Sequence, residues 1–391
     1  MDGDVKHILI VVSISTFAFW LSSAMLRPIF PLYLDNVGFT AFELGIVLTI
    51  PQLLSIFLRV PLARYSRRMG RIKFLTLAIL LNTISIFLYF LFTSKPIITF
   101  IRLIHTLPIA AFGPVAMAYV SIITPEKGRG GIMGLYLTSV GLSIFLGPLV
   151  TSAVTTVMDI EYVFIWASLP SFLAFTLLIS TRRNSIIDIE LDNEVIAEPL
   201  IKGFKRILNY RGFILICLSA LLYSMSMGFM RAFLPLFLKD TYFLEASLIS
   251  LLYSLRGFSN VISRPLAGHL SDKIGVGILV VTGLFISALT LFGLSLTPPI
   301  EFVAVLLALF GVSWGVRAVS SINFIGFYLD ERDREVGMAL FYNMFDIGVS
   351  IGAITTGYLL ELFTYSEILN ILGGLVLLAS IITLPLAIKR Y

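Results

Sequence analysis

The chain has 391 residues, of which 58% are hydrophobic and 13% are charged, and its formal net charge is +5. A soluble protein of this length cannot bury so much apolar surface, so the composition excludes a water-soluble fold and predicts a chain embedded in a lipid bilayer. The positive charge has the distribution that membrane topology produces, and we do not interpret it as nucleic-acid binding.

A helix needs about 20 predominantly apolar residues to cross a bilayer. Twelve stretches meet this requirement, six on each side of a polar segment. In chain order they cover residues 8–34, 42–62, 72–93, 97–121, 131–155, 162–181, 212–238, 245–267, 277–296, 301–327, 336–360 and 367–388. The sequence therefore predicts an all-α integral membrane protein with two pseudo-symmetric six-helix bundles at 1–181 and 212–391, joined by a linker at 182–211.

The basic residues predict the orientation of these spans. If the N-terminus lies inside, nineteen of the 28 Lys and Arg residues fall in cytoplasmic segments, with Lys73 at the inner end of the third span counted among them. Lys95 and Lys239 lie outside, and the other seven lie within spans. Segments rich in Lys and Arg stay on the cytoplasmic side during insertion. We therefore expect both termini in the cytoplasm and a multi-pass protein of the cell membrane.

The linker mixes acidic residues with a basic end. Within Pro199–Tyr210 the apolar residues fall on one helical face, with basic residues around them: Leu200, Phe204, Ile207 and Leu208 are apolar, and Lys202, Lys205, Arg206 and Arg211 are basic. This pattern favours a short amphipathic helix on the inner leaflet. A regulatory docking site is the alternative.

The two halves share an internal repeat. Leu26–Leu34 returns as Met230–Leu238, 204 residues later, with Arg27 matched by Arg231. The correspondence continues at nearly the same offset in Arg59/Arg264, Ser66/Ser271, Gly70/Gly275, Arg129/Arg334, Met133/Met338 and Gly147/Gly352. Duplicated membrane halves are a known architecture for carrying a solute across a bilayer. The repeat therefore points to transport.

Two loops carry a shared motif. The loop at Gly268–Gly275 fits the pattern G-x-x-x-D-(R/K)-x-G, and the loop at Ala63–Lys73 keeps Gly70 and the basic residues but has Arg67 at the acidic position. This pattern resembles the loops between the second and third and between the eighth and ninth helices of the major facilitator superfamily. The resemblance implies a twelve-helix fold whose halves open alternately to the two sides of the membrane.

Three further segments resemble the same family. Arg102–Thr106 is similar to its R-x-x-Q-G segment, Pro125–Gly134 to its loop between the fourth and fifth helices, and Gly147-Pro148 to part of its antiporter signature. Serine and threonine replace glycines of that signature, so it does not establish an antiporter. On the fifth and eleventh spans we expect glycines to mark close helix packing, namely Gly134, Gly141, Gly147, Gly348 and Gly352.

The resemblance also implies a cytoplasmic gate. In the family, the acidic loop residue contacts the start of a helix in the other half, where the helix dipole favours a carboxylate. The gating candidates are Arg67, Arg68, Gly70, Arg129, Gly268, Asp272, Lys273, Gly275 and Arg334. Because Arg67 replaces the acid in the first half, we expect it to pair with Asp333 or Glu335. The alternative is that Arg67 only contributes to the inward positive charge.

Ionisable residues inside the spans are costly and need a reason. Estimated depth places Arg27, Arg102, His105 and Arg231 toward the outside, and Arg256, Arg317 and Asp346 near the midplane. We predict a substrate site formed by Arg27, Arg102, His105, Arg231, Arg256, Arg317 and Asn323. Alternatively, Arg27 and Arg231 extend to the outer headgroups, helped by helix distortion at Pro31 and Pro235.

Two residues are candidates for coupling transport to protons. Arginine is not deprotonated in proteins, so only Asp346 and His105 can carry a transported proton among these charges. The alternative for Asp346 is a structural ion pair with Arg317 or Arg256, because buried ions are usually paired.

These features together predict a secondary active transporter of a small organic solute. The excess of arginine favours an anion, carried by proton-coupled transport or exchange. The alternatives are an exporter of amphipathic drugs, which the aromatic residues and Gly147-Pro148 favour, and a solute sensor. The sequence shows no catalytic constellation, metal-ligand spacing or Walker motif, so we expect neither an enzyme nor a cofactor. The expected partners are the solute, the bilayer and protons, without nucleic acid, and one chain is expected to act as a monomer.

Overall fold

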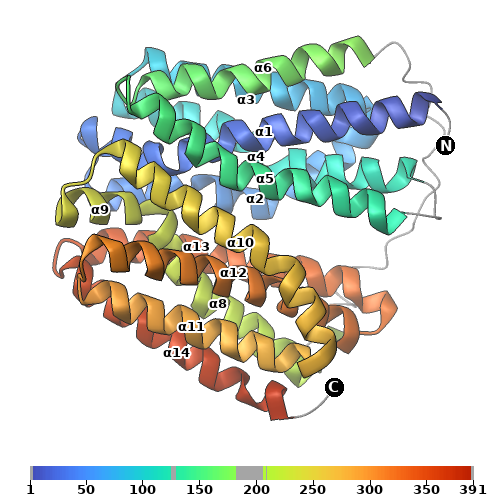
Figure 1. The fold of residues 1–391 in the computed structure, drawn as a ribbon. Coiled ribbons are helices and arrows are strands. Elements are labelled where there is room, and N and C mark those ends of the chain that lie inside the picture. The colour runs from blue at the N-terminus through green and yellow to red at the C-terminus, as the bar shows by residue number, and fades with distance from the viewer. Residues whose placement is uncertain (1–2, 125–128, 182–205, 208, 389–391) are drawn as a thin grey trace. The chain divides into compact units, whose positions relative to one another are not determined.

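The computed structural model describes residues 3–124, 129–181, 206–207 and 209–388. These residues form helices and connecting turns, and no strand occurs among them. In chain order the helices (Figure 1) are α1 (Gly3–Asn36), α2 (Ala41–Met69), α3 (Arg71–Leu91), α4 (Lys95–Ile123), α5 (Arg129–Thr155), α6 (Tyr162–Thr181), α8 (Arg211–Ala232), α9 (Leu234–Tyr242), α10 (Ala246–Ile274), α11 (Val276–Ser295), α12 (Ile300–Tyr328), α13 (Glu331–Leu359) and α14 (Tyr365–Ile388). The predicted all-α fold is confirmed.

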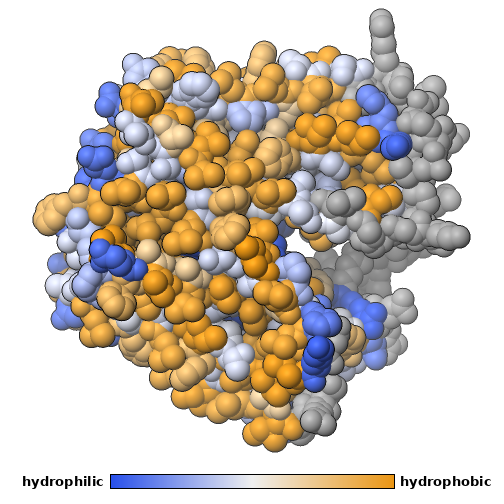
Figure 2. All heavy atoms as spheres, in the orientation of Figure 1, coloured by the Kyte–Doolittle hydropathy of each residue, from blue (hydrophilic) through white to orange (hydrophobic). Residues whose placement is uncertain are grey.

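Eleven of the described helices are long and apolar enough to cross a membrane, namely α1 to α6, α8 and α11 to α14. The eighth predicted span corresponds to α10, which has 29 residues and carries Arg256 and Arg264 within its length. A helix suits this environment because it satisfies every backbone hydrogen bond internally. Large apolar side chains such as Phe57, Leu173 and Phe302 are exposed, and Figure 2 shows hydrophobic residues spread over the face in view.

The repeated prolines have different effects in the two halves. Pro28 and Pro31 lie inside α1, which continues to Asn36. In the second half, α8 ends at Ala232 and α9 begins at Leu234, with Pro235 in its first turn. Proline fits the first turn of a helix, where its missing N–H has no helical partner. The predicted distortion at Pro235 is therefore confirmed as a break, whereas α1 stays helical through its prolines.

Gly70 and Gly275 form matching one-residue turns. Gly70 joins α2 to α3 with φ 90°, and Gly275 joins α10 to α11 with φ 94°. Residues with a Cβ atom rarely adopt this region, so glycine is required at both places. The two gating glycines of the predicted loop motif thus set the angle at which one helix enters the next.

The chain divides into two compact units. Unit 1 comprises Met1–Phe39, Ile50–Glu194 and Glu245–Ser254, and unit 2 comprises Thr40–Thr49, Val195–Leu244 and Leu255–Tyr391. The predicted halves are continuous, with a separate linker at 182–211. In this grouping the division falls within the linker, the beginning of α2 belongs to unit 2, and the beginning of α10 belongs to unit 1.

The helices pack in the same pattern within each unit. In unit 1, α1 packs against α5 and α6, and α3 packs against α4 and α6. In unit 2, α8 packs against α13 and α14, and α11 packs against α12 and α14. The repeat found in the sequence is thus a repeat of helix packing.

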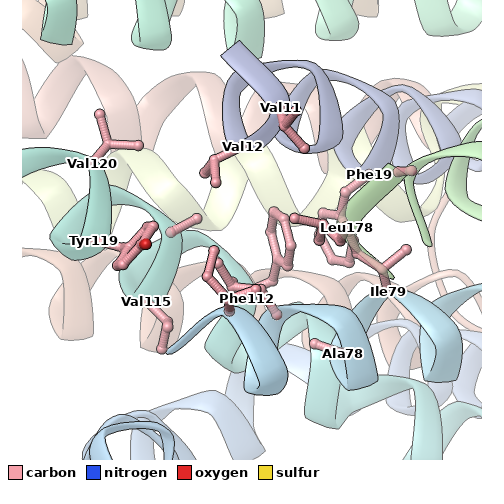
Figure 3. Packing of buried hydrophobic residues seen from close by; sticks show 14 of the residues in the cluster. Val11, Val12, Phe19, Ala78, Ile79, Phe112, Val115, Tyr119, Val120 and Leu178 are labelled. Carbon is pink, nitrogen blue, oxygen red and sulfur yellow. The ribbon is translucent and has the colours of Figure 1, made fainter. Parts of the chain in front are cut away.

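The core of unit 1 is a cluster of apolar side chains from α1, α3, α4, α5 and α6, part of which Figure 3 shows. Phe19 of α1 stacks on Phe112 of α4, with ring centroids 4.0 Å apart, and both rings are buried. Ile79 of α3 and Leu178 of α6 complete this contact region. Lipid tails are as apolar as these side chains, so the hydrophobic effect does not drive helices together inside a membrane. Close van der Waals contact therefore has to stabilise the bundle.

Glycines allow the closest helix contacts in both units. A Cβ atom on Gly147 of α5 would lie 2.5 Å from Cβ of Ala24 on α1. At the repeat-related position in unit 2, a Cβ atom on Gly352 of α13 would lie 2.1 Å from the carbonyl oxygen of Met225 on α8. Gly348 is equally close to α8. Gly134 was expected to mark a close contact as well, but its Cβ position has nothing within 4 Å, so that prediction is wrong.

Candidate functional site

Two arginines of unit 2 lie beside two aromatic rings, and a third binds the backbone next to one of these arginines. The guanidinium of Arg317 on α12 lies 4.1 Å from the ring centroid of Tyr223 on α8 and 5.7 Å from that of Phe345 on α13. The guanidinium of Arg231 lies 5.8 Å from the same Phe345 ring. Arg256 of α10 donates through Nη1 to the carbonyl oxygen of Met230, at 3.5 Å. We call these five residues (Tyr223, Arg231, Arg256, Arg317 and Phe345) the arginine cluster.

Close helix packing brings α10 and α12 together beside this cluster. A Cβ atom on Gly311 would lie 2.3 Å from the carbonyl oxygen of Arg256, and one on Gly315 would lie 2.0 Å from Oγ of Ser263. On α11, Gly283 leaves room for Arg317, since a Cβ atom there would lie 3.1 Å from Cβ of Arg317. Small residues on two helices thus hold the arginines inside the unit.

Arg317 is the most exceptional member of the cluster. Its side chain is 3% exposed, and among the described residues nothing accepts a hydrogen bond from its Nε. Burying an incompletely paired ion costs several kcal/mol. A desolvated cation–π contact returns about 2 kcal/mol or more. The rings therefore offset part of the cost, and an anion that accepts from Nε would offset more.

The other substrate candidates lie outside this cluster, and for Arg102 too nothing among the described residues accepts a hydrogen bond from the buried Nε. In unit 1 the guanidinium of Arg102 lies 4.8 Å from the ring centroid of Phe30, and Arg27 is partly buried on α1. Asn323 donates through its amide to Oγ of Ser271, at 3.3 Å, and so connects α12 to the end of α10. The structure thus brings together Arg231, Arg256 and Arg317 and places Asn323 at a helix contact.

His105 belongs to a buried hydrogen-bond chain across four helices of unit 1. Its Nε2 lies 2.9 Å from Oδ1 of Asn82, and its Nδ1 lies 3.3 Å from the hydroxyl of Tyr89. The amide nitrogen of Asn82 donates to Oγ of Ser171 at 2.8 Å, and Ser171 donates to Oγ of Ser22 at 2.9 Å. The side chain of His105 is 1% exposed.

This chain defines the tautomer of the imidazole. Because the amide nitrogen of Asn82 donates to Ser171, its oxygen is the atom that faces His105, so Nε2 carries the proton. Nδ1 then accepts from the hydroxyl of Tyr89. Both ring nitrogens have complementary partners, which is the arrangement of a neutral histidine.

Asp346 follows Phe345 on α13 and therefore lies next to the arginine cluster in the chain. Its side chain is partly buried, and its carbonyl oxygen accepts a hydrogen bond from Oγ of Ser350 at 2.9 Å. The sequence identified the charged members of this region. It did not identify Tyr223 or Phe345, because aromatic residues are frequent along the spans and nothing in their spacing distinguishes these two.

The gating candidates lie at the ends of helices. Arg67, Arg68, Lys273 and Arg334 are exposed, and Nε of Arg334 donates to the carbonyl oxygen of Leu329 at 3.2 Å. Gly268 lies in α10, with open space at its Cβ position. The side chains of Arg129, Asp272 and Glu335 lie outside the described part of the structure.

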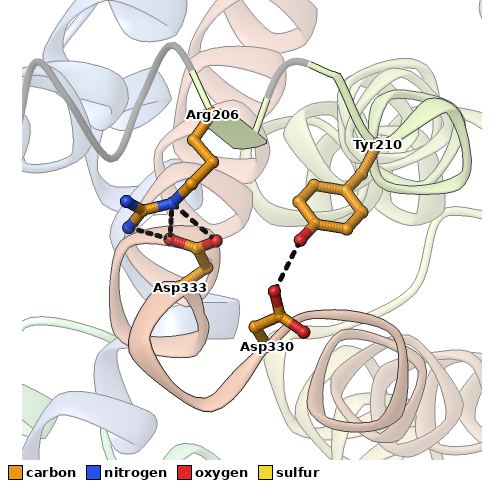
Figure 4. A network of polar contacts seen from close by, with 4 residues as sticks. All are labelled: Arg206, Tyr210, Asp330 and Asp333. Atoms are coloured by element: carbon orange, nitrogen blue, oxygen red, sulfur yellow. Dashed lines mark hydrogen bonds and ion pairs between the residues drawn. The ribbon is translucent and has the colours of Figure 1, made fainter.

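Asp333, one expected partner of Arg67, is bound to Arg206 of the linker (Figure 4). Sequence reasoning missed this pair because it assigned Arg206 to the basic residues of the expected amphipathic helix. Among the described residues, no group of three or more His, Cys, Asp or Glu side chains is arranged to hold a metal ion.

Comparison with known proteins agrees with this architecture. The sequence profile of the Major Facilitator Superfamily matches residues 12–242 and 216–390. An uncharacterized MFS-type transporter of Methanocaldococcus jannaschii is 20% identical over 387 residues, covering 96% of this chain and 98% of the relative. The multi-drug resistance efflux pump PmrA of Streptococcus pneumoniae is 23% identical and covers 79% of this chain and 82% of its own.

The fold also matches a solved structure. The inward-facing, occupied crystal structure of a bacterial homolog to the human lysosomal transporter Spinster superposes with a TM-score of 0.81 at 14% identity, covering 100% of this chain and 98% of the other. The predicted family is thus confirmed by profile, sequence and fold. The chain belongs to the Major Facilitator Superfamily and is a multi-pass transporter of the cell membrane.

Proposed function

We propose that the chain is a secondary active transporter of small organic anions and that Arg317 binds the anionic group. The observation that carries this proposal is the buried guanidinium of Arg317, whose Nε lacks an acceptor among the described residues. A carboxylate or phosphate oxygen is the natural acceptor, because guanidinium groups form short, charge-assisted hydrogen bonds with both. Arg231 and Arg256 add positive potential to the same region.

The surroundings of Arg317 indicate the rest of the solute. The rings of Tyr223 and Phe345 flank the guanidinium, and Phe310 stacks on Tyr223 with ring centroids 6.2 Å apart. Ligand sites commonly combine apolar and aromatic walls with few polar groups that fix orientation. We therefore infer an amphipathic anion, with an acidic group for Arg317 and an apolar or aromatic body.

Alternating access and proton coupling complete the proposal. In alternating access the two halves expose the solute site first to one side of the membrane and then to the other. The same site must therefore bind the solute in both states. We assign the coupling proton to Asp346, because His105 already uses both ring nitrogens within unit 1. The inferred cycle moves solute and proton and makes no covalent change, so the chain acts without enzymatic chemistry.

The site is tested by ligand-induced stabilisation of the purified protein. A ligand that binds the folded state raises its stability by RT ln(1 + [L]/Kd), so the direction of transport need not be known. The panel contains aliphatic and aromatic carboxylates, organic phosphates and lipophilic cations, at about pH 5.5 and about pH 7.5. We expect an amphipathic anion to raise the melting temperature of the unmodified protein.

Arg317→Gln should abolish this stabilisation, and Arg317→Lys should keep only part of it, because lysine lacks the planar fork. Arg211→Gln is the matched control, since it removes the same charge from an exposed position at the start of α8. Equal stabilisation of Arg317→Gln and the unmodified protein would contradict the assignment of Arg317.

Export of amphipathic drugs is the second candidate function. The aromatic walls of the arginine cluster favour it, and a relative named as a multi-drug efflux pump is consistent with it. In the same panel, stabilisation by lipophilic cations alone, lost in Asp346→Asn and kept in Arg317→Gln, would favour this candidate over an anion transporter.

A further inference from the structure

The end of the linker is attached to the beginning of α13. Nε of Arg206 lies 2.8 Å from Oδ1 and 2.9 Å from Oδ2 of Asp333, and its Nη2 also contacts Oδ1. The hydroxyl of Tyr210 donates to Oδ2 of Asp330 at 3.0 Å. Figure 4 shows both contacts, with Asp333 in the first turn of α13 and Asp330 immediately before it.

Apolar contacts accompany these polar ones. Ile207 is fully buried, and the ring of Tyr210 packs edge-on against Tyr328 at the end of α12, with centroids 6.0 Å apart. The backbone turns here, since N–H of Asn209 donates to Arg206 and N–H of Tyr210 donates to Ile207. We call the described residues Arg206, Ile207, Asn209 and Tyr210 the linker end.

The burial of Ile207 bears on the two interpretations of this segment. A helix lying on the membrane would turn Ile207 toward lipid, whereas its side chain is 0% exposed against the protein. The linker end is therefore packed against the protein at Ile207, and the regulatory docking site stays an untested alternative. The remaining residues of the expected amphipathic helix, 199–205 and 208, lie outside the described residues.

We propose that the linker end is a clamp that positions α13 and, through it, the arginine cluster. The helix α13 runs unbroken from Glu331 to Leu359 and has no proline. Phe345 lies about 18 Å along this helix from Asp333, at ~1.5 Å per residue. A displacement of the first turn therefore reaches Phe345, whose ring contacts Arg231 and Arg317. Arg206 is thus a positioning residue that acts through Asp333 and α13.

The two partners differ in their access to water. The side chain of Asp333 is 0% exposed, whereas that of Arg206 is 27% exposed. Removing Arg206 takes a cation with two N–H donors away from a buried carboxylate, and burial makes such a loss costly. Removing the carboxylate instead leaves an arginine that can turn toward water. A neutral substitution of Arg206 should therefore lower the stability of the folded protein more than a neutral substitution of Asp333.

The test uses the purified full chain without any ligand, so its outcome is independent of the proposed anion. Arg206→Gln should lower the melting temperature by several degrees more than Asp333→Asn. The melting temperature of the double variant Arg206→Gln/Asp333→Asn should lie close to that of Asp333→Asn, because the double variant has no buried charge. Arg206→Lys should recover part of the loss, since it restores the charge without the fork.

Hydrogen exchange of backbone amides distinguishes positioning from general stabilisation. Well below the melting temperature, exchange in residues 331–345 should become at least about threefold faster in Arg206→Gln, and exchange in unit 1 should not change. Arg211→Gln, which removes the same charge from an exposed side chain outside the linker end, is the matched control and should behave like the unmodified protein.

Equal effects of Arg206→Gln and Asp333→Asn on melting, or faster exchange confined to the linker end, would overturn the clamp. If Arg206→Gln yields no folded protein, the double variant serves in its place. It lacks the buried charge and should still show faster exchange in residues 331–345, and normal exchange there would refute the proposal.

Discussion

Gly352→Val is expected to prevent accumulation of the folded protein. A Cβ atom at this position would lie 2.1 Å from the carbonyl oxygen and 2.4 Å from Cα of Met225. These are backbone atoms of α8 and cannot rotate away, so α8 and α13 would have to separate. Overpacking a core commonly costs about 1–3 kcal/mol, and a backbone clash should cost at least the upper value. The measurement is the yield of monodisperse protein from membranes.

The same substitution at Gly374 of α14 is the control. Gly374 is exposed and its Cβ position has nothing within 4 Å, so Gly374→Val changes the side chain without a clash. The control should be purified in normal amounts. A normal yield and melting temperature for Gly352→Val would show that the close contact of α8 and α13 is not needed for folding.

Features that follow from the local order of residues along the chain were predictable from the sequence. Long apolar stretches predicted the membrane helices, because the bilayer requires a minimum length of apolar chain. The repeat predicted equivalent packing, and the pair Gly147 and Gly352 does occupy equivalent close contacts on α5 and α13. The loop motif predicted special roles for Gly70 and Gly275, whose positive φ values explain why glycine occurs there.

Features that depend on side-chain partners from distant helices were not predictable. A single histidine in an apolar span suggests a function, and only the structure shows that Asn82 of α3 and Tyr89 engage both nitrogens of His105. The charged residues of the arginine cluster were identified individually, but their selection from seven candidates required the aromatic contacts of Tyr223 and Phe345. The charge pattern likewise suggested Arg67 as a partner of Asp333, whereas the structure shows Arg206 of the linker bound to it.

Asp346→Asn is expected to abolish accumulation driven by a pH gradient while preserving exchange of solute across the membrane. A carboxylate can take up a proton on one side and release it on the other, and an amide cannot. Exchange requires only binding and reorientation of the loaded protein, so a substitution that removes the proton carrier should leave it intact. The measurement compares the two modes in proteoliposomes, with an anion that stabilises the protein in the ligand panel.

His105→Gln is the informative partner variant. Protonation of Nδ1 would reverse its hydrogen bond with Tyr89, whose hydroxyl oxygen would then accept. The hydroxyl proton of Tyr89 would lose its present acceptor, so proton uptake at His105 would require the buried chain to rearrange. Loss of the imidazole should cost about 1–3 kcal/mol of stability by leaving buried polar groups unpaired. Accumulation should nevertheless keep its pH dependence.

The two variants together separate coupling from structure. A loss of both accumulation and exchange in Asp346→Asn, with a lower melting temperature, would instead indicate that Asp346 forms a structural ion pair with an arginine of the cluster. Loss of pH-driven accumulation in His105→Gln alone would transfer the coupling role to unit 1. Coupling by Asp346 requires the opposite pattern, because its position beside Phe345 would connect a proton to the residues proposed to bind the anion.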